Sequence, residues 1–496
     1  MTYVVGVDIG TSAVKVLLVD LEGKIIDEVS RPLSLSQPQS GWSEQDPEEW
    51  VKETEEALKE LTERFDEDVS EIEGLSFSGQ MHGLVLLDHQ YNVVRPAILW
   101  NDTRTTKQCQ DIYEKVGEER LLAITKNPAL EGFTLSKILW VKKEEPENFG
   151  RAATFVLPKD YVRYRLTGEL SMDYSDAAGT LLLDIEKKNW STEVCQAVGL
   201  PVSFCPSLVD STAQTGTVTD ADTGLSRSTK VFAGGADNAC GAVGAGILTE
   251  GKTLCSIGTS GVVLSYEAEA DKDFGGDAHY FYHAAPDALY TMGVTLAAGY
   301  SLSWFKVVFA PEEEFEDFVD GVEEVPPGAR GLLFTPYIAG ERTPHADAFI
   351  RGTFTGLDTF HRRADFVRAV MEGITFSLNE SIEMFRKNGK TIDTIVSIGG
   401  GAKNEAWLQM QADIFNATIV KQKSEQGPGM GAAMIAAYGC GWCDTLAGCA
   451  DRFLEEAEQF EPNTQRVETY KRLFALYQKV YHQTKELNEE LKDFRK

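Results

Sequence analysis

The chain has 496 residues, of which 43% are hydrophobic and 25% are charged, and its net charge is −30. A length and composition of this kind predict two to four globular domains and exclude a wholly disordered chain. The negative charge repels phosphate backbones and anionic lipid surfaces, which argues against nucleic acid and membranes as partners. The N-terminus lacks a basic segment, and no apolar run is long enough to span a bilayer, so we expect a cytoplasmic protein without a signal peptide.

Three β-rich runs open the chain, at residues 3–8, 13–20 and 24–31, and the short turns between them predict an antiparallel meander. A helix follows, because Asp46 can cap its first turn and Pro47 fits the first helical position. Strand-like runs return at residues 72–78, 84–88 and 93–100. This order predicts an α/β protein with mixed sheets flanked by helices.

A repeat is the strongest sign of domain organisation. Asp8-Ile-Gly-Thr-Ser12 recurs as Ser256-Ile-Gly-Thr-Ser260, half the chain length later, and both copies lie between two strand-like runs. Repetition in the same strand–turn–strand context predicts two related halves. We place the boundary near residue 249, giving domains 1–249 and 250–496. The second domain includes a long amphipathic helix that begins at about Thr469 and serves as a scaffold or an interface.

Two helical runs of small residues, 239–247 and 429–437, allow close helix packing. They are open to two interpretations, a hinge between the halves or ordinary tight packing in the core. A third segment, Gly246-Ile-Leu-Thr-Glu-Gly-Lys-Thr253, has the letters of a phosphate-binding P-loop. That motif needs a strand before it and a helix after it, whereas the order here is reversed, so we interpret it as a turn.

The two Gly-Thr-Ser turns are candidate anion sites, because such turns offer several N–H and O–H donors at one point. Two turns from paired halves are suited to hold a polyphosphate from both sides. Asp8 ends the strand before the first turn, and a carboxylate there suits Mg²⁺ through the water-mediated contact that this ion favours. Lys15 is either a cation near the phosphates or a solvated strand lysine.

Three further segments carry candidate chemistry. Glycines 399–401 lie between a strand and a helix. They form either part of an adenosine pocket or an ordinary strand-to-helix turn. Asp237 follows a glycine-rich turn and is either a capping residue or a general base, the group that phosphoryl transfer to an alcohol requires. Residues 78–83 contain His82, a sugar contact or a structural histidine. The nearby segment Trp100-Asn-Asp-Thr-Arg104 is dense in hydrogen-bonding groups, which suits a polyol.

These segments together resemble the FGGY family of carbohydrate kinases, within the actin-like ATPase superfamily. The resemblance covers nearly the whole chain and is carried by VGVDIGTSAVKVLLVD, SGQMHG, WNDTR, DYSDAAGT, GGADNACGAVG, SIGTSGV, PYIAGERTPHAD and GGGAKNEAWLQMQADI. It implies a two-domain, ribonuclease-H-like fold with a cleft between the domains. Within the family, SGQMHG, WNDTR and GERTPH most resemble members that transfer phosphate from ATP to the 5-hydroxyl of D-xylulose.

The resemblance also implies roles for individual residues. Asp237 matches the catalytic base and Asp8 the Mg²⁺ contact, so ATP and Mg²⁺ are the implied cofactors. Tyr300 and Gly429 depart from the expected glycine and alanine. The implied substrate contacts are Met81, His82 and Asn238, to which we add Trp100, Asp102 and Arg104. The ATP contacts are Gly10, Thr11, Ser12, Lys15, Gly258, Thr259, Ser260, Gly400, Gly401, Ala402 and Asn404.

The resemblance leaves the sugar open. Another ketopentose, a pentitol or a sugar acid is an alternative substrate, although the chain shows no basic cluster suited to the carboxylate of a sugar acid such as gluconate. A protein that binds ATP without phosphorylating a sugar is a second alternative, which leaves Asp237 and SGQMHG unexplained. We expect the sugar and ATP as binding partners. The sequence leaves open whether the chain forms a homodimer.

Overall fold

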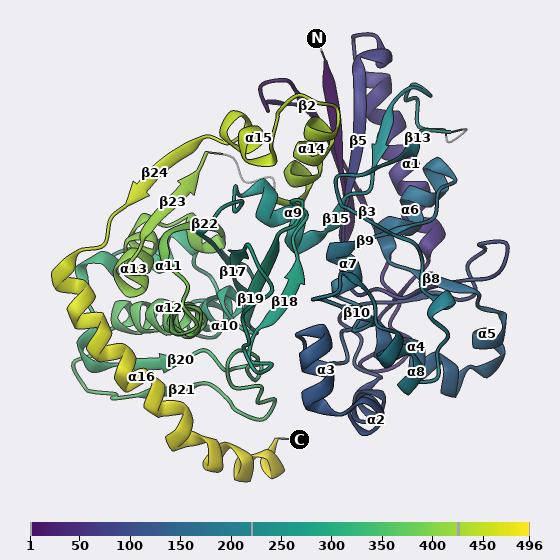
Figure 1. The fold of residues 1–496 in the computed structure, drawn as a ribbon. Helices are drawn as coiled ribbons and strands as arrows, with labels where there is room; N and C mark the ends of the chain where they lie inside the picture. Colours follow the sequence, from purple (N-terminus) through teal and green to yellow (C-terminus); the bar gives the residue numbers. More distant parts are fainter. Residues whose placement is uncertain (1, 220–221, 424–426, 496) are drawn as a thin grey trace. The chain divides into compact units, whose positions relative to one another are not determined.

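The computed structural model describes residues 2–219, 222–423 and 427–495. The chain folds into two compact units (Figure 1). The first contains Met1–Thr249, Tyr266–Tyr290 and Gln426–Glu455, and the second contains Glu250–Ser265, Thr291–Glu425 and Glu456–Lys496. The chain thus leaves the first unit after Thr249, and two later segments return to it. Our division into domains 1–249 and 250–496 stays a prediction. Among the described residues, every helix is too short or too polar to cross a membrane.

The first unit is built on a sheet with the strand order β13-β14-β5-β1-β2-β3. Strand β5 lies parallel to both β1 and β14, and the pairs β1–β2, β2–β3 and β13–β14 are antiparallel. The bounds of these strands are β1 (Tyr3–Ile9), β2 (Ala13–Asp20), β3 (Ile25–Pro32), β5 (Ile72–Gly79), β13 (Gln214–Thr217) and β14 (Lys230–Phe232). The short strand β15 (Gly235–Ala236) also pairs with the end of β5.

Helices and short strands complete the first unit. Its helices are α1 (Pro47–Arg64), α2 (Thr106–Val116), α3 (Glu118–Thr125), α4 (Thr134–Glu144), α5 (Pro146–Arg151), α6 (Pro158–Thr167), α7 (Tyr174–Ala178), α8 (Thr192–Ala197), α9 (Asp237–Gly244), α14 (Gly427–Gly439) and α15 (Leu446–Phe453). Its short strands are β4 (Glu44–Gln45), β6 (Val85–Leu87), β7 (Ala97–Ile98), β8 (Thr154–Val156), β9 (Met172–Asp173), β10 (Leu183–Asp184), β11 (Asn189–Trp190), β12 (Leu208–Val209) and β18 (His279–Tyr282).

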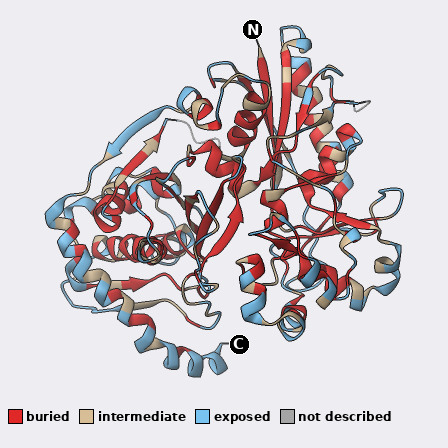
Figure 2. Ribbon diagram, viewed as in Figure 1, coloured by how far each residue is buried: buried red, intermediate tan, exposed pale blue. Residues whose placement is uncertain are grey.

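The second unit is built on a sheet with the order β24-β23-β22-β16-β17-β19. These strands are β16 (Gly251–Ile257), β17 (Gly261–Glu267), β19 (Leu289–Thr295), β22 (Ile392–Gly399), β23 (Thr418–Gln422) and β24 (Glu456–Phe460), and a separate hairpin joins β20 (Leu333–Thr335) to β21 (Thr353–Thr355). The helices are α10 (Gly299–Phe309), α11 (Phe315–Val319), α12 (Arg363–Lys387), α13 (Glu405–Phe415) and α16 (Thr464–Leu491). Figure 2 shows the central strands buried and much of α16 exposed.

The same sheet topology occurs in both units, in agreement with the repeat in the sequence. In each, an antiparallel hairpin contains the Gly-Thr-Ser turn, and its first strand lies parallel to a later strand. Asp8 pairs with Ser78 across β1 and β5, and Ser256 pairs with Ile398 across β16 and β22. The prediction of an α/β fold with mixed sheets is confirmed, and the two turns occupy equivalent places in their sheets.

Most local predictions agree with the structure. The opening meander is present, and Asp46 caps α1 by accepting a hydrogen bond from the backbone N–H of Glu48. Two predictions need correction. Only Ala97–Ile98 of the run 93–100 forms a strand, because Pro96 has no N–H to donate to a ladder. The C-terminal helix begins at Thr464 rather than Thr469, because the Asn463 side chain caps it by accepting from N–H groups of its first turn.

The two helices of small residues, α9 and α14, pack against each other within the first unit, and α14 also covers β1 and β5. Glycine permits this approach: a Cβ atom built on Gly431 would lie 1.8 Å from the carbonyl oxygen of Cys240, and one on Gly6 would lie 2.1 Å from that of Gly429. The structure thus shows the tight packing that one interpretation expected, and a hinge stays a prediction.

We expect Gly431→Ala to destabilise the protein by about 1–3 kcal/mol, because overpacking must push α9 away from α14. This exceeds the gain of about 1 kcal/mol in helix propensity. Thermal unfolding measures the change. Gly150→Ala in α5 is the matched control, since nothing lies within 4 Å of its added Cβ and only the propensity gain remains. Equal melting temperatures for the two variants would contradict the packing argument.

Candidate active site

The first Gly-Thr-Ser turn joins β1 to β2 and is held by side chains from three other segments. The backbone N–H of Gly10 donates to the carbonyl of Ala13 at 3.0 Å, which closes the turn. The Thr11 hydroxyl donates to Gln80 Oε1 at 3.2 Å and accepts from the Trp100 indole at 2.9 Å. The side-chain amide of Gln45 donates to the Thr11 carbonyl at 2.7 Å. The turn is therefore fixed before any ligand binds.

Asp8 and Asp237 come together because their strands flank the same end of β5. Asp8 pairs with Ser78 from one side, and Gly235 of β15 pairs with Ser78 from the other. Asp237 follows β15 directly and is the first residue of α9. Its Oδ1 accepts hydrogen bonds from the backbone N–H and the side-chain amide of Asn238, at 2.7 and 3.2 Å.

Both carboxyl groups have perturbed acidities. Burial raises the pKa of Asp237 to about 7, and the negative charge of Asp8 adds to this rise, while the N–H of Asn238 opposes it. Burial also raises the pKa of Asp8, against the influence of Ser78 and Lys15. A carboxyl group that titrates near neutrality is suited to accept a proton during catalysis.

Asp8 also has the features of a metal ligand. Its Oδ1 atom is buried and has no hydrogen-bond partner among the described residues. An unpaired carboxylate oxygen beside a second carboxyl group is costly unless a cation or water binds there. Mg²⁺ binds proteins through one or two carboxylates and keeps several waters. The residues present therefore fit the predicted ion.

Met81, His82 and Asn238 are brought together next to Asp237. The Asn238 amide donates to the Met81 sulfur at 3.5 Å. His82 has a backbone φ of 66°, a left-handed conformation that a side chain rarely adopts without support. Its Nδ1 lies 2.7 Å from the carbonyl oxygen of Gly179, which can only accept, so Nδ1 carries the proton. Lys137 Nζ donates to the His82 carbonyl at 3.0 Å and holds this loop.

The other predicted polyol contacts have partners within the protein. Asp102 and Arg104 pair at 2.7 Å, with side chains that are 0% and 1% exposed. Arg104 also pairs with Glu44 at 2.7 Å and lies over the ring of Trp42. This pair braces the loop that presents Trp100, whose side chain is exposed. A direct role of Asp102 and Arg104 in binding substrate stays a prediction.

Lys15 lies opposite Asp8 in the register of β1 and β2. Its ammonium group is 3.4 Å from a carboxylate oxygen of Glu28, as in the solvated-lysine interpretation. Ser12 is exposed at the tip of the turn. Both positions are compatible with contact to a bound anion, and neither requires it.

In the second unit, the N-terminus of α10 supports the other Gly-Thr-Ser turn. The backbone N–H of Gly258 donates to the Ser260 carbonyl at 3.0 Å. The N–H groups of Gly299 and Tyr300 donate to the carbonyls of Gly258 and Thr259, at 2.8 and 3.1 Å. A Cβ atom on Gly299 would lie 2.5 Å from the Gly258 carbonyl oxygen, so only glycine permits this approach.

The glycine-rich segment after β22 closely approaches β16. Gly399 has a φ of 80°, and a Cβ atom on Gly401 would lie 2.7 Å from that of Ile257. A short 3₁₀ turn follows at Gly400–Ala402, and Asn404 caps α13 by accepting from the N–H of Trp407 at 2.9 Å. The segment is thus a strand-to-helix turn whose backbone packs directly against the end of β16.

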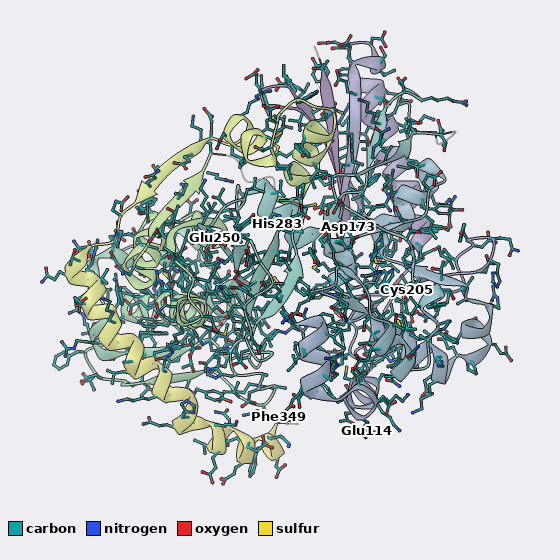
Figure 3. All side chains as sticks on the ribbon, viewed as in Figure 1. Glu114, Asp173, Cys205, Glu250, His283 and Phe349 are labelled. Atoms are coloured by element: carbon teal, nitrogen blue, oxygen red, sulfur yellow. The ribbon has the colours of Figure 1, made fainter. Side chains whose placement is uncertain are left out.

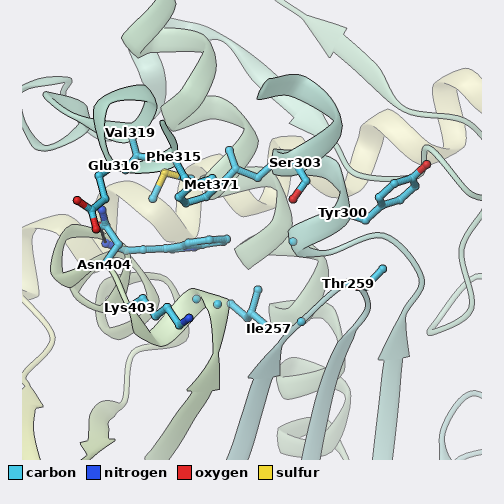
Figure 4. Close-up of a pocket in the computed structure, with 16 residues that line it drawn as sticks. Ile257, Thr259, Tyr300, Ser303, Phe315, Glu316, Val319, Met371, Lys403 and Asn404 are labelled. Atoms are coloured by element: carbon cyan, nitrogen blue, oxygen red, sulfur yellow. Dashed lines mark hydrogen bonds between the residues drawn. The ribbon is translucent and has the colours of Figure 1, made fainter. Parts of the chain in front are cut away.

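A pocket of about 700 Å³ lies beside these two turns, within the second unit (Figure 4). Of the predicted ATP contacts, Gly258, Thr259, Gly400, Gly401 and Asn404 line it, whereas Ser260 and Ala402 do not. Tyr300 and Trp407 were expected near the nucleotide, whereas most of the remaining wall comes from α10, α11 and α12, which are distant in the chain and gave no local signal. These further lining residues are Ile257, Gly299, Tyr300, Leu302, Ser303, Phe315, Glu316, Val319, Met371, Lys403 and Trp407.

The lining explains what the pocket can bind. Apolar side chains such as Phe315, Val319 and Met371 suit a flat ring, and the backbone at Gly258 and Thr259 provides polar groups at the other end of the pocket (Figure 4). Tyr300, the residue that departs from the family pattern, lies at the side of Thr259. A ligand with an aromatic base and a polar tail fits this division.

We expect Asp237→Asn to raise the melting temperature by a few degrees more at pH 8 than at pH 4. The folded carboxyl has a pKa of about 7, against 3.8 ordinarily, so the folded state holds an extra proton between these values and loses stability as the pH rises. Asparagine removes this loss. Thermal unfolding in a chelating buffer without nucleotide measures the difference in melting temperature between the variant and the wild type. An equal difference at both pH values would contradict the assigned pKa.

Comparison with known proteins identifies the family. The N-terminal domain model of the FGGY family of carbohydrate kinases matches residues 3–244, and the C-terminal domain model matches residues 253–440. A curated relative from Bacillus subtilis (strain 168), named xylulose kinase, is 59% identical over 499 residues and covers 100% of both chains.

Two solved structures share the fold over almost the whole chain. Ligand-bound xylulose kinase from Lactobacillus acidophilus has a TM-score of 0.94 and 28% identity, covering 99% of this chain and 100% of that one. Gluconate kinase from the same organism has a TM-score of 0.92 and 28% identity, covering 97% and 98%. With both family models matched and a full-length relative at 59% identity, this chain belongs to the FGGY family of carbohydrate kinases.

Proposed function

We propose that this chain transfers the terminal phosphate of ATP to the 5-hydroxyl of D-xylulose and forms D-xylulose 5-phosphate. As a carbohydrate kinase it is a phosphotransferase, and ATP is the phosphate donor that its family implies. The observation that carries the choice of sugar is the 59% identity, over the full length of both chains, to a relative named xylulose kinase. In this proposal the reaction serves xylose breakdown, and we expect the enzyme to act in the cytoplasm.

In this proposal Asp237 is the general base. Phosphoryl transfer requires little covalent chemistry from the protein, and its main needs are a positioned hydroxyl and stabilised charge. Asp237 accepts the proton of the attacking hydroxyl, and its pKa of about 7 allows it to hold that proton at neutral pH. Met81, His82 and Asn238 contact the sugar, and the hydrogen bonds from Asn238 to the Met81 sulfur and from His82 to the Gly179 carbonyl hold these side chains so that the hydroxyl is oriented toward Asp237.

The nucleotide is expected to bind through both Gly-Thr-Ser turns. The adenosine occupies the pocket of the second unit, and backbone N–H groups of each turn face phosphate oxygens. Asp8 would hold Mg²⁺ through water, and the ion would offset negative charge on the phosphates. In a chain with a net charge of −30, backbone donors and this cation would offset the repulsion that a triphosphate meets.

A second candidate substrate is gluconate, because a solved gluconate kinase matches almost as closely in fold as the xylulose kinase does. The sugar therefore has to be tested directly. A coupled assay of ADP release over D-xylulose, other pentuloses, pentitols and gluconate should give the highest kcat/KM with D-xylulose. A higher value with gluconate or a pentitol would overturn the choice of sugar while leaving the kinase assignment in place.

The nucleotide pocket can be tested separately. Ser303 lines the pocket from α10, so Ser303→Trp should fill part of it and raise the KM for ATP about tenfold or more, with the KM for sugar nearly unchanged. Val307→Trp, one turn later on the same helix, is the control, because Val307 is 67% exposed and is not a lining residue. Equal effects of the two tryptophans on ATP binding would place the nucleotide elsewhere.

A further inference from the structure

A group of charged side chains lies in the interior of the first unit, behind the segment that leads to Asp237. Lys159 of α6 has its ammonium nitrogen 2.7 Å from Asp160 Oδ1, 2.7 Å from Asp173 Oδ1 and 2.9 Å from Asp176 Oδ2. Arg163, one turn later, lies 3.1 Å from Asp160. All five side chains are fully buried, and Figure 3 labels Asp173 among them.

This group holds its own cation. The three carboxylates have oxygen atoms within 4.8 Å of one another, close enough for a metal ion. The Lys159 ammonium already contacts all three, and Arg163 supplies a second positive charge. Burial raises the pKa of Asp176 well above its ordinary range, whereas Lys159 lowers that of Asp173. The Lys159 ammonium lies among the three carboxylates, where a metal ion would have to sit, so the cluster is an interior network of ion pairs rather than a metal site.

The network is connected to the backbone next to Asp237. Asp173 Oδ2 accepts from the hydroxyl of Ser175 at 2.5 Å. Ser175 has only one hydroxyl proton, which it donates to Asp173, so its oxygen accepts the N–H of Ala236 at 2.9 Å. Ala236 is the residue before Asp237. The chain of contacts from Lys159 through Asp173 and Ser175 therefore ends at the residue whose carbonyl forms the peptide bond to Asp237.

Parallel contacts hold the preceding residues. Arg163 Nη1 donates to the Ala233 carbonyl at 2.8 Å. The carbonyl of Ser211 accepts the N–H of Gly234 at 2.9 Å, and the Ser211 hydroxyl donates to Asp173 at 2.7 Å. Gly234 itself has a φ of 74°, and a Cβ atom there would lie 2.0 Å from the Phe77 carbonyl oxygen. The segment 233–236 consists of a sharp bend and the short strand β15, and contacts from Arg163, Ser211 and Ser175 hold three of its four residues.

We propose that Ser175 and Asp173 are positioning residues for Asp237. Through the Ala236 N–H, the buried Lys159 cluster fixes the direction in which the Asp237 carboxylate points, and so its alignment with the sugar hydroxyl. This inference rests on the proposed role of Asp237 as the base. Loss of the contact should lower turnover, because misalignment of a reacting group by about 1 Å can cost on the order of a hundredfold in rate.

The test is a double-mutant cycle in the full-length enzyme with D-xylulose and ATP. Asp237→Asn alone should lower kcat about 10²–10⁴-fold, as for loss of a general base. Ser175→Ala alone should lower kcat about 10–100-fold, with the KM for ATP within about twofold of wild type. In the Asp237→Asn background, Ser175→Ala should cause almost no further loss, because both changes act through one group.

Ser191→Ala is the matched control. Ser191 is 4% exposed and its hydroxyl also accepts a backbone N–H, that of Val194 at 3.2 Å, but it caps α8 away from Asp237. It should leave kcat within about twofold. Hydrogen exchange of peptides containing Ala236 gives a readout independent of activity, and Ser175→Ala should reduce protection there. If Ser175→Ala proves too unstable to assay, Ser211→Ala, which removes one donor to Asp173 only, should lower kcat by a smaller factor.

The outcomes separate the two proposals. Full activity in Asp237→Asn would overturn the proposed base and, with it, the positioning role. A large loss in Asp237→Asn together with wild-type kcat in Ser175→Ala would overturn the positioning role alone. An equal loss from Ser175→Ala in both backgrounds would also overturn it, because the effect would then be a general loss of structure.

Discussion

The first unit brings two carboxyl groups, Asp8 and Asp237, together at one end of its sheet, and the site depends on this arrangement. Each is partly withdrawn from water, and the charge of Asp8 disfavours ionisation of Asp237. Such a pair is stable only where the backbone that carries it is held firmly or a cation compensates the charge. Here β1, β5 and β15 supply the fixed backbone, and an unpaired oxygen on Asp8 is available to the cation.

The two units share a topology but carry different chemical groups. Both contain the same hairpin with a Gly-Thr-Ser turn, but the residue that opens the repeated motif is Asp8 in one and Ser256 in the other. Asp8, Asp237 and the residues that we propose to contact the sugar are in the first unit. The second has a pocket of about 700 Å³ that is lined by the turns after β16 and β22 and by residues of α10, α11, α12 and α13. The same arrangement of strands thus carries different residues at equivalent positions in the two units.

Two groups of buried ion pairs support backbone segments beside the site. The Asp102–Arg104 pair braces the loop of Trp100, and the Lys159 cluster holds the turn before Asp237. In both cases the charged side chains are buried and each lies beside a group of opposite charge, so they fix geometry without exposing charge to the site. A polar, closely spaced sequence segment can thus be essential to a site without contacting the substrate.

The sequence by itself determined the features that local rules govern. The meander, the cap at Asp46, the two turns and the placement of Asp8, Asp237 and Asn404 at the ends of strands or helices follow from short-range patterns. Tertiary structure decided the rest. The pocket wall at Phe315 and Met371, and the chain from Lys159 to Ala236, join residues far apart in sequence, and only packing brings such groups into contact. Likewise, the raised pKa of Asp237 results from its burial and from the nearby charge of Asp8, and both depend on tertiary packing.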